Sequence, residues 1–273
     1  MAERQGEGAS IGIVAGGGQF PLMCAREAGR RGMSIFVVAH HGETDPLVDS
    51  LADKVRWVHL GQLGAMIKFF RKNRVSEIIF AGSITKKRIF RDIRPDLRGI
   101  KLWNRIDKRL DDGILRAVAH EFEQEGIMVR PSTMLLEDLV VEKRCYTRKR
   151  PDRTQLRDME IGMELAREIG RLDIGQCVVI KDRVVLAVEA IEGTDRTISR
   201  AGELGGRGAV VVKVCKPSQD RRFDLPSIGI GTVETMIEAG AEVLAVEAGS
   251  ALFFDRDMAT DLADRSGIVI TGV

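Results

Sequence analysis

The chain has 273 residues, of which 44% are hydrophobic and 30% are charged. This composition is typical of globular proteins and argues against a disordered chain, and no apolar run approaches the ~20 residues that a membrane span needs. The 42 basic and 40 acidic residues give a net charge of +2, so no overall basic bias indicates a nucleic-acid-binding protein. The length suits one large or two ordinary domains.

The N-terminal region begins with an alternation of short apolar runs and amphipathic segments. A strand, a glycine-rich loop, a helix and a second strand follow one another, as in the first βαβ unit of a nucleotide-binding sheet. Glycines let the backbone approach a phosphate, and a helix N-terminus favours an anion. Gly17, Gly18 and Gln19 are therefore candidate substrate-binding residues. The predicted elements are a strand at 11–15, a helix from Pro21 to about Arg31 and a strand at 34–39.

The glycine loop departs from the dinucleotide fingerprint in two ways. Pro21 stands where the third glycine belongs, and the strand 34–39 ends in His40 and His41 instead of an acid for a ribose hydroxyl. Both departures argue against a nicotinamide-dependent oxidoreductase, and a purely structural turn remains an alternative. The two histidines are adjacent and not at metal-chelating helical spacing, so a ligand role and a surface or turn position both stay open.

The alternation continues as far as residue 130. It predicts a parallel sheet with helices on both faces. A run of five basic residues fits either a solvated helix or a site for anionic substrate or lipid phosphate. The basic residues are Lys86, Lys87, Arg88, Arg91 and Arg94. The predicted strands are 54–60, 77–81 and 127–130, and the predicted helices are 64–73, 100–110 and 114–125, with Asp111 or Asp112 as the cap of the last.

Residues 143–153 (KRCYTRKRPDR) break this pattern. They are basic, lack apolar periodicity and contain Pro151, so they predict a linker. The expected organisation is a Rossmann-like parallel-sheet domain at 1–142, a linker, and a mixed α/β catalytic domain at 154–273. In the second domain we predict helices at 158–169, 232–238 and 257–265 (capped by Asp255), a hairpin of strands 177–180 and 184–191, and strands at 209–214, 242–247, 251–254 and 268–271.

The four cysteines give no sign of a disulfide framework or a zinc site. They are widely spaced, at Cys24, Cys145, Cys177 and Cys215, and form no CxxC pair. A reducing compartment is the expected setting. The first ten residues hold no apolar stretch, so we expect no signal peptide and a cytoplasmic protein that meets lipid only from its surface.

The chemically richest stretch runs from Val184 to Gly229. Two apolar runs, 184–190 and 209–214, each lead into a segment of acids, bases and glycines that we take as irregular. Carboxylates and cations at the ends of neighbouring strands suit a metal-assisted site for phosphates. Two strands with solvated turns are the alternative. The first segment carries Glu189, Glu192, Gly193, Thr194 and Asp195; the second carries Lys213, Lys216, Gln219, Arg222 and Asp224.

Several strings resemble one family. They are IVAGGGQFP (13–21), DDG (111–113), LDIGQCVVI (172–180), AVEAIEGTDRTISR (187–200) and KPSQDRRFDLPSIGIGTV (216–233). Across nearly the whole chain the sequence resembles the UDP-2,3-diacylglucosamine pyrophosphatases of the LpxI type. The resemblance implies hydrolysis of UDP-2,3-diacylglucosamine to UMP and 2,3-diacylglucosamine 1-phosphate (lipid X) in lipid A biosynthesis, by attack on the phosphorus nearer the sugar.

The resemblance also implies Mg²⁺ or another divalent cation, a homodimer, and peripheral contact with the inner-membrane surface. It places the key aspartate of the QDxRxDLP motif at Asp224. A pyrophosphate resists water through charge repulsion, so the site must supply positive charge and an activated water. We therefore expect Asp224 and Lys213 to be catalytic. Asp224, Glu189, Glu192 and Asp195 are expected metal ligands, and Gly193, Thr194, Lys216, Gln219 and Arg222 join Gly17, Gly18 and Gln19 as expected substrate-binding residues.

Two alternatives stay open. Each of these residues other than Asp224 suits a structural salt bridge nearly as well as a direct contact. A non-catalytic nucleotide-sugar or lipid-binding module is the competing function. Acids that lie beside basic residues favour metal chemistry over simple anion binding, which needs basic groups alone.

Overall fold

The computed structural model describes residues 9–84, 93–105, 111–217, 219–223 and 225–273. The chain divides into two compact units, residues 1–137 and 138–273. The predicted linker differs from this division, because residues 143–153 pack within the second unit. The Tyr146 amide donates to the carbonyl of Ile270, and the Arg148 amide donates to the carboxylate of Asp264, both at 2.8 Å. Contacts of this kind leave no periodic pattern of apolar residues in the sequence, and the absence of such a pattern in residues 143–153 predicts a linker.

The first unit is built on a five-stranded sheet in the order β3-β2-β1-β4-β5. All neighbouring strands are parallel, as predicted. The strands are β1 (Ser10–Ala15), β2 (Ser34–His40), β3 (Lys54–Val58), β4 (Glu77–Ala81) and β5 (Met128–Arg130). The helices are α1 (Phe20–Arg30), α2 (Leu63–Lys72), α4 (Leu97–Trp103) and α5 (Asp111–Gln124), with 3-10 turns at Pro46–Ser50, Ser132–Leu135 and Glu137–Leu139.

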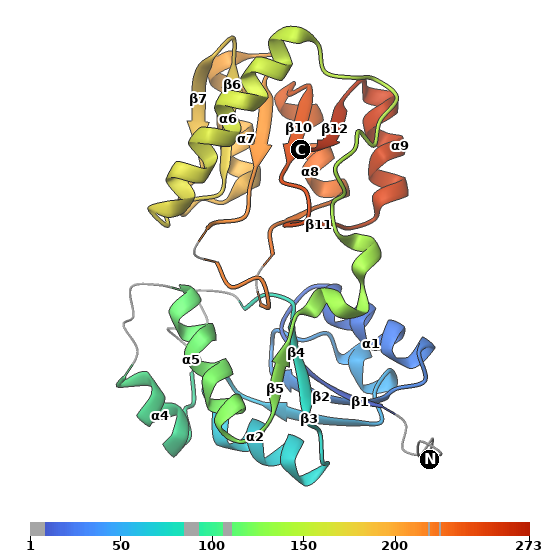
Figure 1. Cartoon of the computed structure of the whole chain (residues 1–273), viewed down its shortest axis with the longest axis vertical. Coiled ribbons are helices and arrows are strands. Elements are labelled where there is room, and N and C mark those ends of the chain that lie inside the picture. The colour runs from blue at the N-terminus through green and yellow to red at the C-terminus, as the bar shows by residue number, and fades with distance from the viewer. Residues whose placement is uncertain (1–8, 85–92, 106–110, 218, 224) are drawn as a thin grey trace, which may run out of the picture. The chain divides into compact units, whose positions relative to one another are not determined.

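Helices cover both faces of this sheet (Figure 1). Ile11 and Ile13 of β1 pack into the same apolar cluster as Leu22 of α1. Gly12 points to the opposite face, where the Phe70 ring of α2 would lie 2.7 Å from an added Cβ. Phe122 of α5 packs against Phe70 on that second face. The period-2 alternation of β1 thus gives each face its own apolar layer.

Two expectations for the first unit need comment. The prediction that Asp111 or Asp112 caps the helix at 114–125 is wrong, because both residues already lie within α5. The predicted helix at 100–110 overlaps α4, which ends at Trp103, and residues 106–110 lie outside the described part. Of the basic run, only Arg94 lies within the described residues.

The second unit has a mixed sheet in the order β12-β10-β8-β6-β7. Strands β8, β10 and β12 are parallel, and β6 is antiparallel to both β8 and β7. The strands are β6 (Cys177–Lys181), β7 (Val184–Val188), β8 (Val210–Lys213), β10 (Val243–Val246) and β12 (Val269–Gly272); β9 (Ser227–Ile228) pairs separately with β11 (Leu252–Phe253). The helices are α6 (Arg153–Arg171), α7 (Thr194–Gly205), α8 (Ile230–Ala239) and α9 (Arg256–Ser266).

Each face of the second sheet has its own core. Met159 and Met163 of α6 pack on one face, against Val178 and Val212 among others. Helices α7, α8 and α9 supply the cluster on the other face, with Ile198, Met236 and Ala259 (Figure 1). The predicted hairpin of β6 and β7 is present, and its turn residues Asp182 and Arg183 both have positive φ, as a two-residue hairpin turn requires.

Helix α7 is the main correction to the second unit, because residues 194–205 were expected to be irregular. Its glycines made the segment read as a loop. Position 202 of this helix requires glycine, because an added Cβ would lie 2.6 Å from the carbonyl oxygen of Ala239 in α8. Position 205 requires glycine for the same reason, because an added Cβ there would lie 2.3 Å from the Leu186 side chain of β7. These glycines permit close helix packing.

The ends of two further helices differ from the prediction. Helix α6 begins five residues early, because Asp152 and Gln155 form a reciprocal capping box. It also runs past residue 169, where the predicted helix ends, and continues through Gly170 to Arg171. Asp255 occupies the N-cap position of α9 as predicted, but its side chain makes no capping hydrogen bond. Within the described ranges, no helix has the length and apolar character to cross a membrane.

Candidate active site

One edge of the second sheet collects most of the predicted site residues. The carboxyl ends of β7, β8 and β10 meet there with the start of β6, because β6 runs antiparallel to its neighbours. Cys177 of β6 pairs in register with Lys213, and its carbonyl accepts the amide of Glu189 at 2.9 Å. Laterally paired residues point to the same face of a sheet. Glu189 and Lys213 therefore flank Cys177 on one face.

The Glu189 side chain is only 6% exposed, and two hydrogen bonds hold its carboxylate in place. Its Oε1 accepts the Thr194 hydroxyl at 3.0 Å, and its Oε2 accepts the Gln176 amide at 3.1 Å. Gly175 allows this approach, since an added Cβ there would lie 2.1 Å from the Glu189 carbonyl oxygen. The carboxylate is therefore preorganised at the sheet edge, by two residues, Gly175 and Gln176, that were not among the predicted site residues.

Lys213 is also only 6% exposed. Its Nζ donates to the carbonyl of Ser227 at 2.8 Å, at the start of β9. Burial raises the pKa of the Cys177 thiol to about 12; the Glu189 and Asp195 carboxylates add to this rise, and Lys213 opposes it. The three charged groups thus all act on one buried thiol, so three predicted site residues converge here.

The predicted phosphate-binding cations are paired with acids in this structure. Lys216 Nζ lies 2.7 Å from Asp173, which sequence reasoning did not single out. The Lys216 amide donates to Gln219 Oε1 at 3.3 Å. Arg222 donates to Asp220 from both Nη2 and Nε, at 2.8 and 3.0 Å. A phosphate reaching these cations would compete with carboxylates already in place.

The predicted metal ligands are brought together only in part. Glu192 bonds Arg200 at 2.7 Å and the Ala190 amide at 3.1 Å. The pKa of Glu192 is held below its ordinary value, first by its own backbone amide and then by Arg200. Asp195 lies in the first turn of α7, which follows Gly193 at the N-cap. Among the described residues, no three His, Cys, Asp or Glu side chains are grouped to hold a metal, and Asp224 lies outside those residues.

The glycines of the loop in the first unit differ in their surroundings: Gly16 and Gly17 pack against the loop after β4, whereas Gly18 faces open space. The Gly17 amide donates to the carbonyl of Ser83 at 2.7 Å, and the Ser83 amide donates back at 3.2 Å, so the loops after β1 and β4 are paired. An added Cβ on Gly16 would lie 2.5 Å from the Ser83 oxygen. Gly18 differs, because its φ is +83° and no atom lies within 4 Å of an added Cβ. Gln19 is the N-cap of α1.

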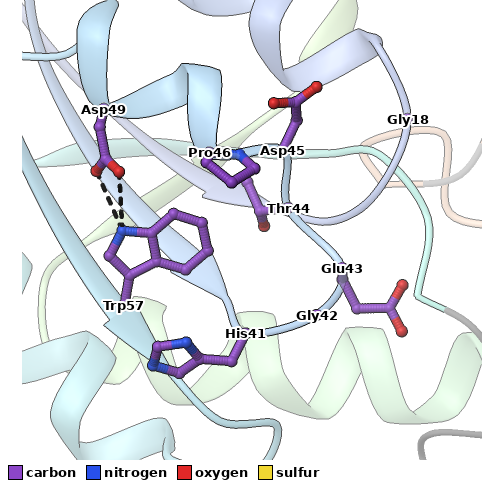
Figure 2. Close-up of a pocket in the computed structure, with 9 residues that line it drawn as sticks. All are labelled: Gly18, His41, Gly42, Glu43, Thr44, Asp45, Pro46, Asp49 and Trp57. Carbon is purple, nitrogen blue, oxygen red and sulfur yellow. Dashed lines mark hydrogen bonds between the residues drawn. The ribbon is translucent and has the colours of Figure 1, made fainter.

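Gly18 also lines a cavity of about 880 Å³ that sequence reasoning did not find (Figure 2). The other described lining residues come from the segment after β2, from the following 3-10 turn and from β3. They are His41, Gly42, Glu43, Thr44, Asp45, Pro46, Asp49 and Trp57. His40 is not among them: it is buried, and its Nδ1 lies 2.9 Å from the Ala15 carbonyl oxygen.

Two solved structures resemble the chain only weakly. The biotin carboxylase domain of the Hydrogenobacter thermophilus 2-oxoglutarate carboxylase, in complex with MgADP, ADP and bicarbonate, matches with a TM-score of 0.29 and 12% identity, over 71% of this chain and 40% of that one. The biotin carboxylase subunit of a pyruvate carboxylase gives a TM-score of 0.28 and 12% identity, over 74% and 43%.

The sequence comparisons are far stronger. Residues 10–139 match the model of the LpxI N-terminal domain, and residues 142–271 match the model of the LpxI C-terminal domain. The UDP-2,3-diacylglucosamine pyrophosphatase LpxI of Caulobacter vibrioides is 33% identical over 276 residues, which cover 96% of this chain and 97% of that protein. This chain belongs to the LpxI family.

Proposed function

We propose that this chain is a hydrolase that cleaves the pyrophosphate bond of UDP-2,3-diacylglucosamine, giving UMP and 2,3-diacylglucosamine 1-phosphate, in lipid A biosynthesis. The activity for which the Caulobacter relative is named supports this substrate, since the match covers nearly the whole of both chains. The observation that carries the proposal is the pair of buried, opposite charges at the edge of the second sheet. Glu189 and Lys213 lie there with the N-terminus of α7 and the segment that leads to Asp224.

We propose that water attacks the phosphorus nearer the sugar. The water oxygen bonds to that phosphorus, the bond to the bridging oxygen breaks, and the bridging oxygen leaves with UMP. Asp224 is the proposed group that positions this water and takes its proton. The Lys213 ammonium has three donors and gives one to Ser227. In a site shielded from water, its charge would strongly stabilise the negative charge that builds up on the phosphates.

We also propose dependence on Mg²⁺. When bound, the ion would neutralise phosphate charge and lower the pKa of a coordinated water. Magnesium in such sites often takes one or two carboxylates together with substrate phosphates, so a cage of three protein acids is not required. Glu189 and Asp224 are the proposed protein ligands. Asp195 is a second choice at the same edge, whereas the Arg200 pair makes Glu192 the least suitable of the predicted acids.

An apolar surface beside the site suits the lipid part of the substrate. Leu172 is 71% exposed, Ile174 is 47% exposed and Ile191 is 95% exposed. The connections that carry them meet where Gly175 approaches Glu189. Exposed apolar side chains gathered next to a polar site are typical of lipid contact. We propose that these three residues contact the acyl chains at the inner-membrane surface. A cytoplasmic location and a homodimer are further proposals that the family resemblance supports.

The experiment is a reaction of the purified chain with UDP-2,3-diacylglucosamine in ¹⁸O-labelled water, with Mg²⁺ or with a chelator. The expected products are unlabelled UMP and a sugar phosphate that carries one ¹⁸O, formed only with Mg²⁺. Label in UMP would place the attack on the other phosphorus. Substrate binding with no product under either condition would instead favour the non-catalytic binding module.

A further inference from the structure

Thr194 bonds the carboxylate of Glu189, although the sequence predicts that it contacts the substrate. We propose that Thr194 is a positioning residue, which holds the Glu189 carboxylate in one orientation and does not itself bind the substrate. The inference rests on the proposed function, because Glu189 needs a fixed orientation only if it takes part in cleavage. Both residues belong to the second unit.

The direction of the hydrogen bond between the two side chains follows from their chemistry. An ionised carboxylate only accepts hydrogen bonds, and a threonine hydroxyl carries a single proton. The Thr194 hydroxyl must therefore donate to Glu189 Oε1, which lies 3.0 Å away. Ionised phosphate oxygens are also acceptors, so the proton that Thr194 gives to Glu189 is not available to a phosphate.

Two bonds from different segments fix the plane of the Glu189 carboxylate. The Gln176 amide, directly before β6, donates to Oε2 at 3.1 Å, while Thr194, at the start of α7, donates to Oε1. The torsion that turns a glutamate carboxylate is soft, so a single bond would leave its orientation loose. A carboxylate has about four lone-pair sites. These contacts among the described residues leave about two of the sites for an incoming cation, and Thr194 helps to decide which two.

The connection between β7 and α7 is built to hold Thr194 in place. Gly193, the N-cap of α7, has a φ of +85°, which residues with a side chain rarely adopt. Its carbonyl is held twice, by the Thr197 amide at 3.2 Å and by the Thr197 hydroxyl at 2.9 Å. Arg200 Nη2 donates to the Val188 carbonyl at 2.9 Å and so ties α7 to the end of β7. The Thr194 hydroxyl is therefore preorganised, as a group that orients another group needs to be.

The test compares two threonines at the start of α7 in the full chain. Thr194→Val removes the hydroxyl and keeps the branched shape of the side chain. Thr197→Val is the matched control, because it also removes one hydroxyl hydrogen bond, while the Gly193 carbonyl keeps the backbone amide of residue 197 as its donor. Melting temperatures check that both variants fold. Thr194→Ala takes the place of Thr194→Val if the valine variant does not fold.

The expected effect is on kcat and not on KM. In hydrolysis of UDP-2,3-diacylglucosamine, Thr194→Val should lower kcat about 10–100-fold, as loss of a partner that orients an active group does. KM should not change, because a positioning residue makes no contact with the bound substrate. Thr194→Ser should restore kcat to within about threefold, since it restores the hydroxyl donor. Thr197→Val should keep the kcat of the unaltered chain.

A double-mutant cycle shows whether Thr194 acts through Glu189. In a Glu189→Gln background, Thr194→Val should lower kcat by less than about twofold further, because the charge that Thr194 orients is already gone. An equal loss in both backgrounds, a raised KM with unchanged kcat, or equal kcat values for Thr194→Val and Thr197→Val would overturn the inference and leave the proposed function standing. No hydrolysis by the folded, unaltered chain would overturn the function, and the positioning role with it.

Discussion

Glu189 and Lys213 lie on opposite sides of Cys177, on one face of the second sheet, and each is almost fully buried. Buried ionised groups need compensating partners. Among the described residues those partners are the Thr194 hydroxyl, the Gln176 amide and the Ser227 carbonyl, none of which carries a formal charge. The two charges are therefore available to an incoming ion, which is a property expected of a site and not of a structural salt bridge.

Glu189→Gln should lower kcat by at least about 10²-fold, because the change removes a charge at the reacting phosphates. The amide oxygen of the glutamine can accept the Gln176 amide while its NH2 group donates to the Thr194 hydroxyl oxygen, so the melting temperature should change little. Glu192→Gln is the matched control, since the contacts of Glu192 with Arg200 and with the Ala190 amide lie outside the proposed chemistry. Initial rates of UMP release measure the effect. Equal kcat values for the two variants would remove Glu189 from the site.

Lys213→Met should abolish most activity and also destabilise the second unit by about 1–3 kcal/mol, because the Ser227 carbonyl loses its donor. Lys181→Met removes a comparable bond, from Nζ to the Gly205 carbonyl at 2.8 Å, at the opposite end of β6. It should cost similar stability and leave kcat unchanged. Urea unfolding and UMP release separate the two effects. An active Lys213→Met variant would show that Lys213 only supports the fold.

Gly162→Ala should destabilise the second unit by about 1–3 kcal/mol, as overpacking of a core does. An added Cβ at Gly162 in α6 would lie 2.5 Å from Val212 in β8. Gly231→Ala in α8 is the control, because no atom lies within 4 Å of its added Cβ, and it should stabilise by about 0.4–1 kcal/mol. Denaturant unfolding of the two full-length variants gives the comparison. A stable Gly162→Ala variant would mean that α6 is free to shift away from the sheet.

His40 should make the first unit lose stability as pH falls below about 6.5, the ordinary histidine pKa. Burial lowers the pKa of His40 in the folded chain; the Ala15 carbonyl and Glu43 oppose this, and His41 adds to it. Between the lowered and the ordinary pKa the unfolded chain binds more protons, so stability rises with pH in that window. Melting temperatures at pH 5.0–7.5 should show a shallower slope for His40→Gln. Parallel slopes would refute the assignment.

Regular periodicity made much of the fold predictable. The repeated succession of strands and helices along the chain predicted the parallel sheet with helices on both faces, and the glycines after α8 and α9 predicted where these helices end. Helix α7 was missed because Gly202 and Gly205 there reflect close contacts with Ala239 and Leu186, residues far along the chain. Intrinsic propensity cannot reveal contacts of that kind.

The site at the edge of the second sheet could be predicted in part from the sequence, whereas the cavity beside Gly18 could not. The edge holding Glu189 and Lys213 could be anticipated because charged residues follow apolar runs directly in sequence. The pairing of Lys216 with Asp173 and of Lys213 with Ser227 could not, since these contacts depend on how separate loops meet. The cavity beside Gly18 forms where the segments after β1 and β2 meet Trp57 of β3, so no single stretch of sequence predicts it.

The most direct test of the proposed function compares the full chain with its Asp224→Ala variant in release of UMP from UDP-2,3-diacylglucosamine with Mg²⁺. The account predicts equimolar UMP and 2,3-diacylglucosamine 1-phosphate from the unaltered chain. It also predicts a loss of at least about 10²-fold in the variant, with an unchanged melting temperature. No UMP from the folded, unaltered chain, or full turnover by the variant, would contradict it.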